Sequence, residues 1–310
     1  MAYNVSPSYE HIFYVGGTGI SGITDLSMSY SVARTPVNIL GGGHIQPVLA
    51  EPIQGEISFT RNYIYDDPLI QLTGDYGVDG SLIYASDLSE SNGQVIGFTS
   101  GYLTNYSISA EVGSIPEVRC TFTVFGQLGS GVRNGELDYS GIHTLPHLCF
   151  LNQDNIILSV DQSDSNRITK FSQEYNITRT PVYELKQKTS QNYYAPTQVI
   201  TQTPVELSTN FTVEIDDYYT ANMIDNVRSG VYKSLGVNIK CPLKEGTLDG
   251  LLDHNSEFIR DHNNQIIQDD GLGITAYNGN IPASGNLLSE SITTSVDGLL
   301  AIDLQFRNFI

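Results

Sequence analysis

A repeated segment constrains the fold of this chain more than any other feature. Residues 23–37 read ITDLSMSYSVARTPV, and residues 168–182 read ITKFSQEYNITRTPV. Eight of these fifteen positions are identical, and the run Arg-Thr-Pro-Val closes both segments. At the same offset of 145 residues, the apolar segment 12–15 aligns with 157–160 without a gap. Because self-similarity of this kind marks a repeated structural unit, the sequence predicts an internal duplication.

The alignment continues to the end of both copies. Phe59-Thr60 corresponds to Phe211-Thr212 after an insertion of seven residues. Residues 103–125 then correspond to 287–309 through the shared positions Leu103/Leu287, Ile108/Ile292, Val112/Val296, Phe122/Phe306 and Phe125/Phe309. The middle of the second copy is longer as well. We therefore predict one domain over residues 1–126, a glycine-rich connector over 127–146, and a second domain over 147–310 with a longer middle insertion.

Alternation of apolar and polar residues identifies the elements as strands. Val118, Cys120, Phe122 and Val124 share one face of such a segment, and the residues between them are polar. The segments 106–112, 211–215 and 302–306 follow the same period of two. This pattern is typical of antiparallel sheets with one face on a core. The expected fold class is mostly β, with two tandem antiparallel β-sandwich or barrel domains and little helix, the helical candidates being 248–262 and short segments after Ala85 and Thr220.

The charge balance excludes several classes of function. The chain has 310 residues with 15 Lys and Arg against 34 Asp and Glu, a formal charge of −19. A protein that grips nucleic-acid phosphates or an anionic membrane needs a basic surface, and this chain lacks the excess of cations. The sequence also contains no apolar run long enough to cross a bilayer, so membrane insertion is not expected.

Four motifs that are typical of common enzyme classes are absent. The sequence contains no GxxxxGK[ST], no HExxH, no GxSxG and no CxxC, so neither an enzyme nor a cofactor is expected. His143, His147 and Cys149 lie close together, but Pro146 interrupts any helix that would set both imidazoles on one face. We interpret these three residues as ordinary connector residues, and no metal site is predicted.

The paired aspartates and the cysteines are expected to have structural and not catalytic roles. The acidic pairs Asp66-Asp67 and Asp216-Asp217 follow corresponding strands without the regular spacing of a Ca²⁺ loop, so we read them as solvated turns. Cys120, Cys149 and Cys241 are widely spaced and odd in number, which favours free thiols over a disulfide framework.

The repeat layout resembles a known family. A strand of the type I-T-x-[LF]-S-x-x-Y-x-[VI]-x-R-T-P-V, a loop with Gly and Pro, a strand of the type G-x-I-S-F-T and a last strand rich in Val and Phe are similar to bacteriophage tail tube proteins. The resemblance implies stacked rings whose subunits lend strands to a continuous inner barrel. A fused pair resembles the tubes in which three double-domain subunits form a pseudohexameric ring.

The resemblance also implies partners and a location. The subunit would assemble with itself and with other tail proteins such as the tape measure, sheath or terminator, in the cytoplasm of the bacterial host, and would reside in the virion tail. Viral DNA would pass through the tube during ejection without specific binding, because an acidic wall repels phosphates. Two alternatives stay open. One is a ring-forming adaptor, distal tail or baseplate component. The other is a carbohydrate-binding or hydrolytic β-sandwich, which only the 19 tyrosines favour.

Two groups of residues are candidates for the function. The segments 41–54 and 186–206 carry apolar residues in a Gly- or Pro-containing context, which predicts contacts with another subunit through Ile45, Val48, Leu49, Tyr193, Tyr194, Val199 and Ile200. Carboxylates at the outward positions of the alternating strands are expected to line the lumen, and these are Glu56, Glu111, Glu214 and Asp303.

Overall fold

In the residues that it describes, the computed structural model shows a mostly β protein with one short helix, which confirms the predicted mostly-β class with little helix. It describes residues 12–31, 34–38, 45–49, 54–63, 67, 69, 72, 74–83, 95–130, 132, 150–152, 155–160, 163–183, 196–215, 218–227, 232–241, 277–282, 284–294 and 300–310. The helix α1 (Tyr218–Val227) confirms the short segment expected after Thr220, although it begins three residues before that segment. The other two helical candidates lie outside the described residues.

The described part of the N-terminal half contributes ten strands. They are β1 (Ile12–Val15), β2 (Thr18–Ile20), β3 (Ile23–Ser31), β4 (Arg34–Asn38), β5 (Ile45–Leu49), β6 (Gln54–Asn62), β7 (Val78–Ile83), β8 (Val95–Glu111), β9 (Glu117–Val124) and β10 (Leu128–Ser130). The last of these lies inside the segment predicted as a connector and pairs with β8.

The described part of the C-terminal half contributes ten more strands. They are β11 (Ile156–Val160), β12 (Ser163–Ser165), β13 (Ile168–Asn176), β14 (Arg179–Val182), β15 (Gln198–Thr201), β16 (Glu206–Ile215), β17 (Leu235–Cys241), β18 (Tyr277–Pro282), β19 (Asn286–Thr293) and β20 (Leu300–Phe309). The ladders within each half and the ladder between β8 and β13, which joins the halves, are antiparallel.

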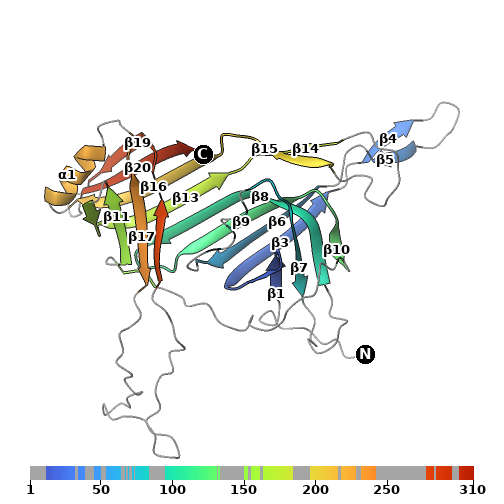
Figure 1. Cartoon of the computed structure of the whole chain (residues 1–310), viewed down its shortest axis with the longest axis horizontal. Helices are drawn as coiled ribbons and strands as arrows, with labels where there is room; N and C mark the ends of the chain where they lie inside the picture. Colours follow the sequence, from blue (N-terminus) through green and yellow to red (C-terminus); the bar gives the residue numbers. More distant parts are fainter. Residues whose placement is uncertain are drawn as a thin grey trace, which may run out of the picture.

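One continuous sheet crosses the boundary between the halves. Its long strands follow the order β19, β20, β16, β13, β8, β9, β6 and β3, and Figure 1 shows them running side by side. The ladder between β13 and β8 joins the C-terminal strands to the N-terminal ones. We call these eight strands the main sheet, and the β8–β13 ladder the internal junction.

Within each half the strands pair in the same order. The first strand pairs with the second and with a later strand, as β1 does with β2 and β7, and β11 with β12 and β17. The third pairs with the sixth, as β3 does with β6 and β13 with β16, and both ladders shift register at corresponding residues, Ile23/Asp25 and Ile168/Lys170. The β8–β9 and β19–β20 ladders likewise share a shift, at Leu103/Asn105 and at Leu287/Ser289.

The halves differ at one corner. In the N-terminal half, β8 is one long strand whose first part pairs with β7 and whose second part belongs to the main sheet. The change occurs near Ser100, whose φ of 57° lies in the left-handed region. Next to it, a Cβ on Gly101 would come within 2.5 Å of the Phe98 ring, so only glycine fits there. In the C-terminal half, β18 and β19 are instead two separate strands, and β18 belongs to a separate sheet with β12, β11 and β17.

The hydrophobic core lies on one face of the main sheet. The alternating positions predicted to face inward are buried, among them Val118, Cys120, Phe122 and Val124, and a single cluster of buried residues includes side chains from both halves. Phe211 stacks on Phe306 at 5.2 Å between ring centroids, and Phe59 stacks on Phe122 at 6.1 Å. The opposite face of the main sheet is therefore left to solvent, and we call it the outer face.

Two hairpins extend from the same end of the main sheet (Figure 1). The β4–β5 hairpin follows β3 and precedes β6, and the β14–β15 hairpin follows β13 and precedes β16. Arg34 begins the first hairpin and Arg179 begins the second, so the repeated Arg-Thr-Pro-Val segments occupy corresponding strands.

Candidate functional site: the outer face and two open edges

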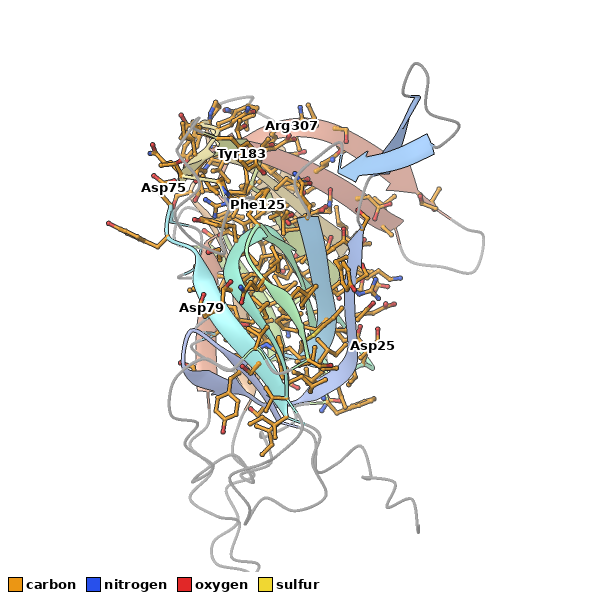
Figure 2. All side chains as sticks on the ribbon, turned by 90° about the vertical axis from the view of Figure 1, so that its right-hand side faces the viewer. Asp25, Asp75, Asp79, Phe125, Tyr183 and Arg307 are labelled. Carbon is orange, nitrogen blue, oxygen red and sulfur yellow. The ribbon has the colours of Figure 1, made fainter. Side chains whose placement is uncertain are left out.

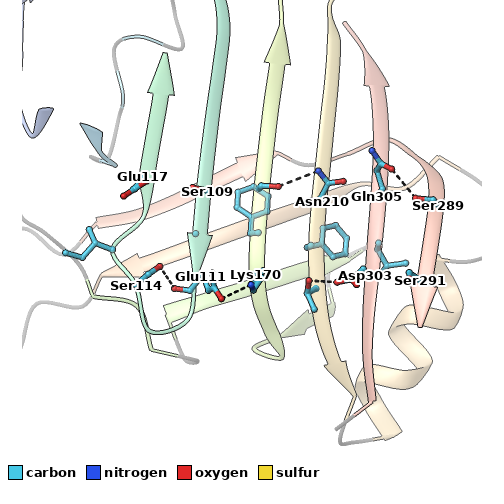
Figure 3. Close-up of a pocket in the computed structure, with 17 residues that line it drawn as sticks. Ser109, Glu111, Ser114, Glu117, Lys170, Asn210, Ser289, Ser291, Asp303 and Gln305 are labelled. Atoms are coloured by element: carbon cyan, nitrogen blue, oxygen red, sulfur yellow. Dashed lines mark hydrogen bonds and ion pairs between the residues drawn. The ribbon is translucent and has the colours of Figure 1, made fainter. Parts of the chain in front are cut away.

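The outer face is covered with polar side chains, because successive residues of a strand point to opposite faces of a sheet. The ladders place Glu111, Lys170, Thr212, Asp303 and Ser291 in one row across five neighbouring strands. Figure 3 shows this row, with hydroxyl and amide side chains in the next row along the strands. The outer face therefore presents water with a hydrated polar surface.

Hydrogen bonds and an ion pair connect this row. The Lys170 ammonium lies 2.8 Å from the Glu111 carboxylate, and the Thr212 hydroxyl donates to Asp303 at 2.5 Å. The hydrogen bond to Glu111 and the charge of that carboxylate raise the pKa of Lys170. Both members of the ion pair are exposed, so the pair orders the surface more than it stabilises the fold.

Carboxylates outnumber cations on the described part of the outer face. Eight acidic residues lie there, namely Asp25, Glu56, Glu111, Glu117, Glu174, Glu206, Glu214 and Asp303. Three basic residues accompany them, namely Arg119, Lys170 and Arg307. Figure 2 shows Asp25 at the outer side of the sheet. The four carboxylates predicted to line a lumen therefore share one face of one sheet, and their position in an assembly stays a prediction.

Two strands of the main sheet have an open edge in the described part of the chain. There, β3 pairs with β6 alone, and β19 pairs with β20 alone. Both strands expose large apolar side chains: Tyr30 is 61% exposed, Ile292 58% and Leu288 50%. Neither strand contains the lysine or proline that commonly protects an edge from pairing with another chain. The edges of β3 and β19 are therefore available for a further strand.

The internal junction shows how such an edge is covered when a strand is present. Asn105 of β8 donates to Glu174 at 2.6 Å and to Asn176 at 2.8 Å, both on β13. On the core side, Tyr106 meets Tyr175 edge to face with 6.1 Å between ring centroids. Burial raises the pKa of Tyr175. The junction thus combines amide and charged contacts on the outer face with aromatic packing inside.

Arg179 fastens one end of the junction. Its side chain is 1% exposed, and its Nε donates to the backbone carbonyl of Leu103 at 3.0 Å. The guanidinium also bonds the Thr201 hydroxyl, lies 3.9 Å from Asp75 and stands 5.7 Å from the centre of the Tyr102 ring. Burial lowers the pKa of Arg179, and the charge of Asp75 opposes that shift. The arginine of the repeated segment therefore ties the C-terminal hairpin to β8.

A buried ionic group lies in the N-terminal half and corrects one prediction. Asp67 was expected in a solvated turn, but it is 5% exposed and forms an ion pair with Arg61, which is buried on β6. The Tyr106 hydroxyl donates to Asp67 at 3.0 Å, and the Leu69 amide donates to it at 2.9 Å. Because a buried charge is retained only when it is paired, Asp67 is held inside by Arg61.

The sequence did contain a signal for this group. Ile57 and Phe59 mark the inward positions of β6, and the same alternation places Arg61 inward, where a cation requires a partner. Beside it, Cys120 is a buried free cysteine as expected, and burial raises the pKa of its thiol. The group is enclosed by the core and offers no access to a substrate.

The predicted subunit contacts are only partly within the described residues. Ile45, Val48 and Leu49 lie on β5, but their side chains are outside the described part, as are Tyr193 and Tyr194 altogether. On β15, Val199 is buried within its own chain and Ile200 is exposed. Of the described members, Ile200 alone presents its side chain for an outside contact.

Among the described residues, no group of three or more His, Cys, Asp or Glu side chains is placed to hold a metal ion. None of the helices in the described part is long and apolar enough to span a membrane. No model of a known protein family matches the sequence, and no curated protein matches it.

Proposed function

We propose that this protein is the structural subunit of a bacteriophage tail tube, which stacks in rings and conducts DNA during ejection. One observation supports the proposal above the others: in the described part of the chain, the eight-stranded main sheet has a polar, acid-rich outer face and an open edge at each end. Copies of such a sheet can pair edge to edge, and the assembly is complete when no edge is left unpaired. The resemblance of the repeated segments to tail tube proteins leads to the same arrangement.

The dimensions of a three-membered ring fit a conduit. Three copies of an eight-stranded sheet form a barrel of 24 strands. With strands about 4.8 Å apart, such a barrel has a circumference of about 115 Å and is about 37 Å wide at the backbone before strand tilt widens it. Barrels of 16 to 18 strands already enclose an aqueous channel, so this one would enclose a wider one.

The outer face of the sheet becomes the wall of the channel in this proposal. Its eight described carboxylates outnumber its three described cations, so a phosphate backbone is repelled at short range. The repulsion is screened over about 8 Å at physiological salt, so charges on the wall itself act on passing DNA more than charges elsewhere. A wall of this kind lets DNA move without adhering.

Negative-stain electron microscopy of the purified protein tests the proposal. Long hollow tubes with a ring repeat are the expected result. Isolated rings would instead favour the alternative of a ring-forming adaptor, distal tail or baseplate component. A protein that stays monomeric at high concentration and binds glycans would overturn the proposal in favour of the carbohydrate-binding β-sandwich.

Charge reversal tests the conduit. We expect tubes of Glu56→Lys/Glu214→Lys to retain duplex DNA at low salt, because both positions lie on the outer face, whereas wild-type tubes do not. Glu111 and Asp303 are left unchanged because they bind Lys170 and Thr212. The charge control is Asp164→Lys/Asp225→Lys, which changes the net charge equally at exposed positions on β12 and α1, although Asp164 also loses a hydrogen bond from the Ser159 hydroxyl. DNA retention by the control to the same extent would remove the charge argument.

A further inference from the structure

We propose that β3 of one copy pairs with β19 of the next copy in the register that β13 and β8 show within the chain. The partner is thus a second copy of this chain, bound through two different edges. The inference deepens the proposed function, since it needs copies that associate, but that function does not itself choose these edges or this register.

The first step is the correspondence between the strands. β3 occupies the place of β13, since each pairs with the sixth strand of its half, with the register shift at the same position. β19 occupies the place of the second part of β8, since each pairs with the last long strand of its half, again with a matching shift. The internal junction is therefore a ladder between a β19-like strand and a β3-like strand.

The register of the internal junction predicts which residues of β3 and β19 lie opposite each other across two copies. In the internal junction, Ser172 lies opposite Ser109 and Glu174 opposite Ser107. The corresponding residues are Ser27 opposite Thr293, and Ser29 opposite Ser291, across two copies. Backbone bonds from Val112 to Thr169 and from Ile177 to Thr104 make the alternate residues the hydrogen-bonded pairs. Both transferred serine and threonine pairs are therefore non-hydrogen-bonded, with Cα atoms about 4.5 Å apart.

The third step is the burial of side chains. Ile108 in β8 is 2% exposed, whereas Ile292 at the corresponding place in β19 is 58% exposed. In the transferred register Ile292 lies opposite Met28, so an apolar pair forms on the core side. Tyr175 is half-buried against Tyr106, whereas its counterpart Tyr30 is 61% exposed. The side chains that are exposed at the open edges are those that the internal junction covers.

The fourth step is the charge of the proposed contact. The outward side chains are Ser27, Ser29 and Ser31 on β3, and Ser289, Ser291 and Thr293 on β19. Glu290, the carboxylate of β19, lies on the core side and falls opposite Tyr30, so no like charges oppose one another there. Two copies of a strongly acidic chain can therefore meet along this edge without direct repulsion.

The two edges are complementary to each other and not to themselves. Pairing β3 with β19 leaves the opposite edge of each copy free for the next, which is a head-to-tail contact that closes into a ring or continues as a filament. Pairing β3 with β3 or β19 with β19 would end the assembly at a dimer. The contact proposed here therefore accounts for propagation as well as for binding.

Disulfide trapping tests the register. The variant Ser27→Cys/Thr293→Cys is made in a chain with Cys149→Ser and Cys241→Ser, and it is oxidised mildly under assembly conditions. Since cysteines at Cα distances of 4.4–6.8 Å can be bridged, we expect most of the protein to shift from the 34.0 kDa band to bands of two and three chains on a non-reducing gel. Reduction should restore the single band.

The matched control is Ser31→Cys/Thr293→Cys, which displaces one thiol by four residues, or about 13 Å along the strand. It should remain a single band. Three results would each overturn the register. They are equal trapping of the test pair and the control pair, trapping of a variant that carries Ser27→Cys without Thr293→Cys, and tubes that form without trapping of the predicted pair. In the last case the proposed function would stand, whereas absence of any assembly by microscopy would overturn both.

Discussion

The internal junction and the two open edges are built from corresponding strands but carry different side chains. The junction has Lys170 with Glu111, Asn105 with Glu174, and buried Arg179 at its end. Ser289 and Ser29 stand at the open edges in place of Asn105 and Glu174, whereas Lys170 corresponds to Asp25 and Arg179 to Arg34. A junction within one chain always finds its partner, so long side chains can be ordered there. An edge that must stay soluble before it pairs is served by small hydroxyl groups, which water satisfies equally well.

Proline at corresponding positions of the two ladders tests this comparison with the largest expected effect. Ile108→Pro removes an amide from the ladder with β13 in the middle of the sheet, so we expect a loss of about 3 kcal/mol or more in unfolding free energy. Ile292→Pro affects an amide that faces an open edge, so the unfolding free energy should stay within about 1 kcal/mol of wild type. Urea unfolding followed by circular dichroism measures both.

Assembly separates the same two variants in the other direction. Ile292→Pro should fold and yet form no tubes, because the proline blocks the proposed ladder to β3 of the next copy. Normal tubes from Ile292→Pro would show that the β19 edge is not an assembly contact.

Removal of the fastening arginine should have the next largest effect. Arg179→Met keeps most of the side-chain volume but loses the charged hydrogen bonds to Leu103 and Thr201, so we expect about 1.5–3 kcal/mol less stability. Arg119→Met is the matched control, since Arg119 is exposed on the same sheet and should change the unfolding free energy by less than about 0.5 kcal/mol. Equal effects of both changes would contradict the fastening role.

The tyrosine pair at the junction predicts a loss of stability at high pH. Burial raises the pKa of Tyr175 above its usual value near 10, so folding favours the neutral phenol. Its contribution is complete below pH 10 and is lost as the pH rises from there through the raised pKa, at up to about 1.4 kcal/mol per pH unit. Tyr175→Phe should lose less stability than wild type between pH 9 and 11, with similar midpoints at pH 8. Identical slopes would place the alkaline loss elsewhere.

The exposed ion pair should have the smallest effect. Lys170→Gln/Glu111→Gln removes a 2.8 Å contact between two exposed side chains, and we expect the urea midpoint to be unchanged within experimental error. Measurements at low and high salt should agree. A clear loss at low salt alone would show that this pair helps to hold the internal junction together.

Much of the secondary structure could be predicted from the sequence, because alternation is local. The inward positions of the segment around Val118 to Val124 follow from a period of two, and all four are buried. The same period identified Glu56, Glu111, Glu214 and Asp303 as outward residues, and the ladders place them on one face. The burial of Asp67 was missed because its partner Arg61 lies on a different segment, and a side chain's nearest residues in sequence do not reveal that contact.

The sequence by itself thus determined the repeat, the strands and the face to which each residue points, since these depend on spacing along the chain. Tertiary structure alone decided that the two halves share one sheet, because the β8–β13 ladder pairs strands far apart in sequence through backbone groups that every residue carries. It also decided that, among the described residues, β3 and β19 each have a strand on one side alone, because the pairing of edges depends on strands that are distant in the sequence.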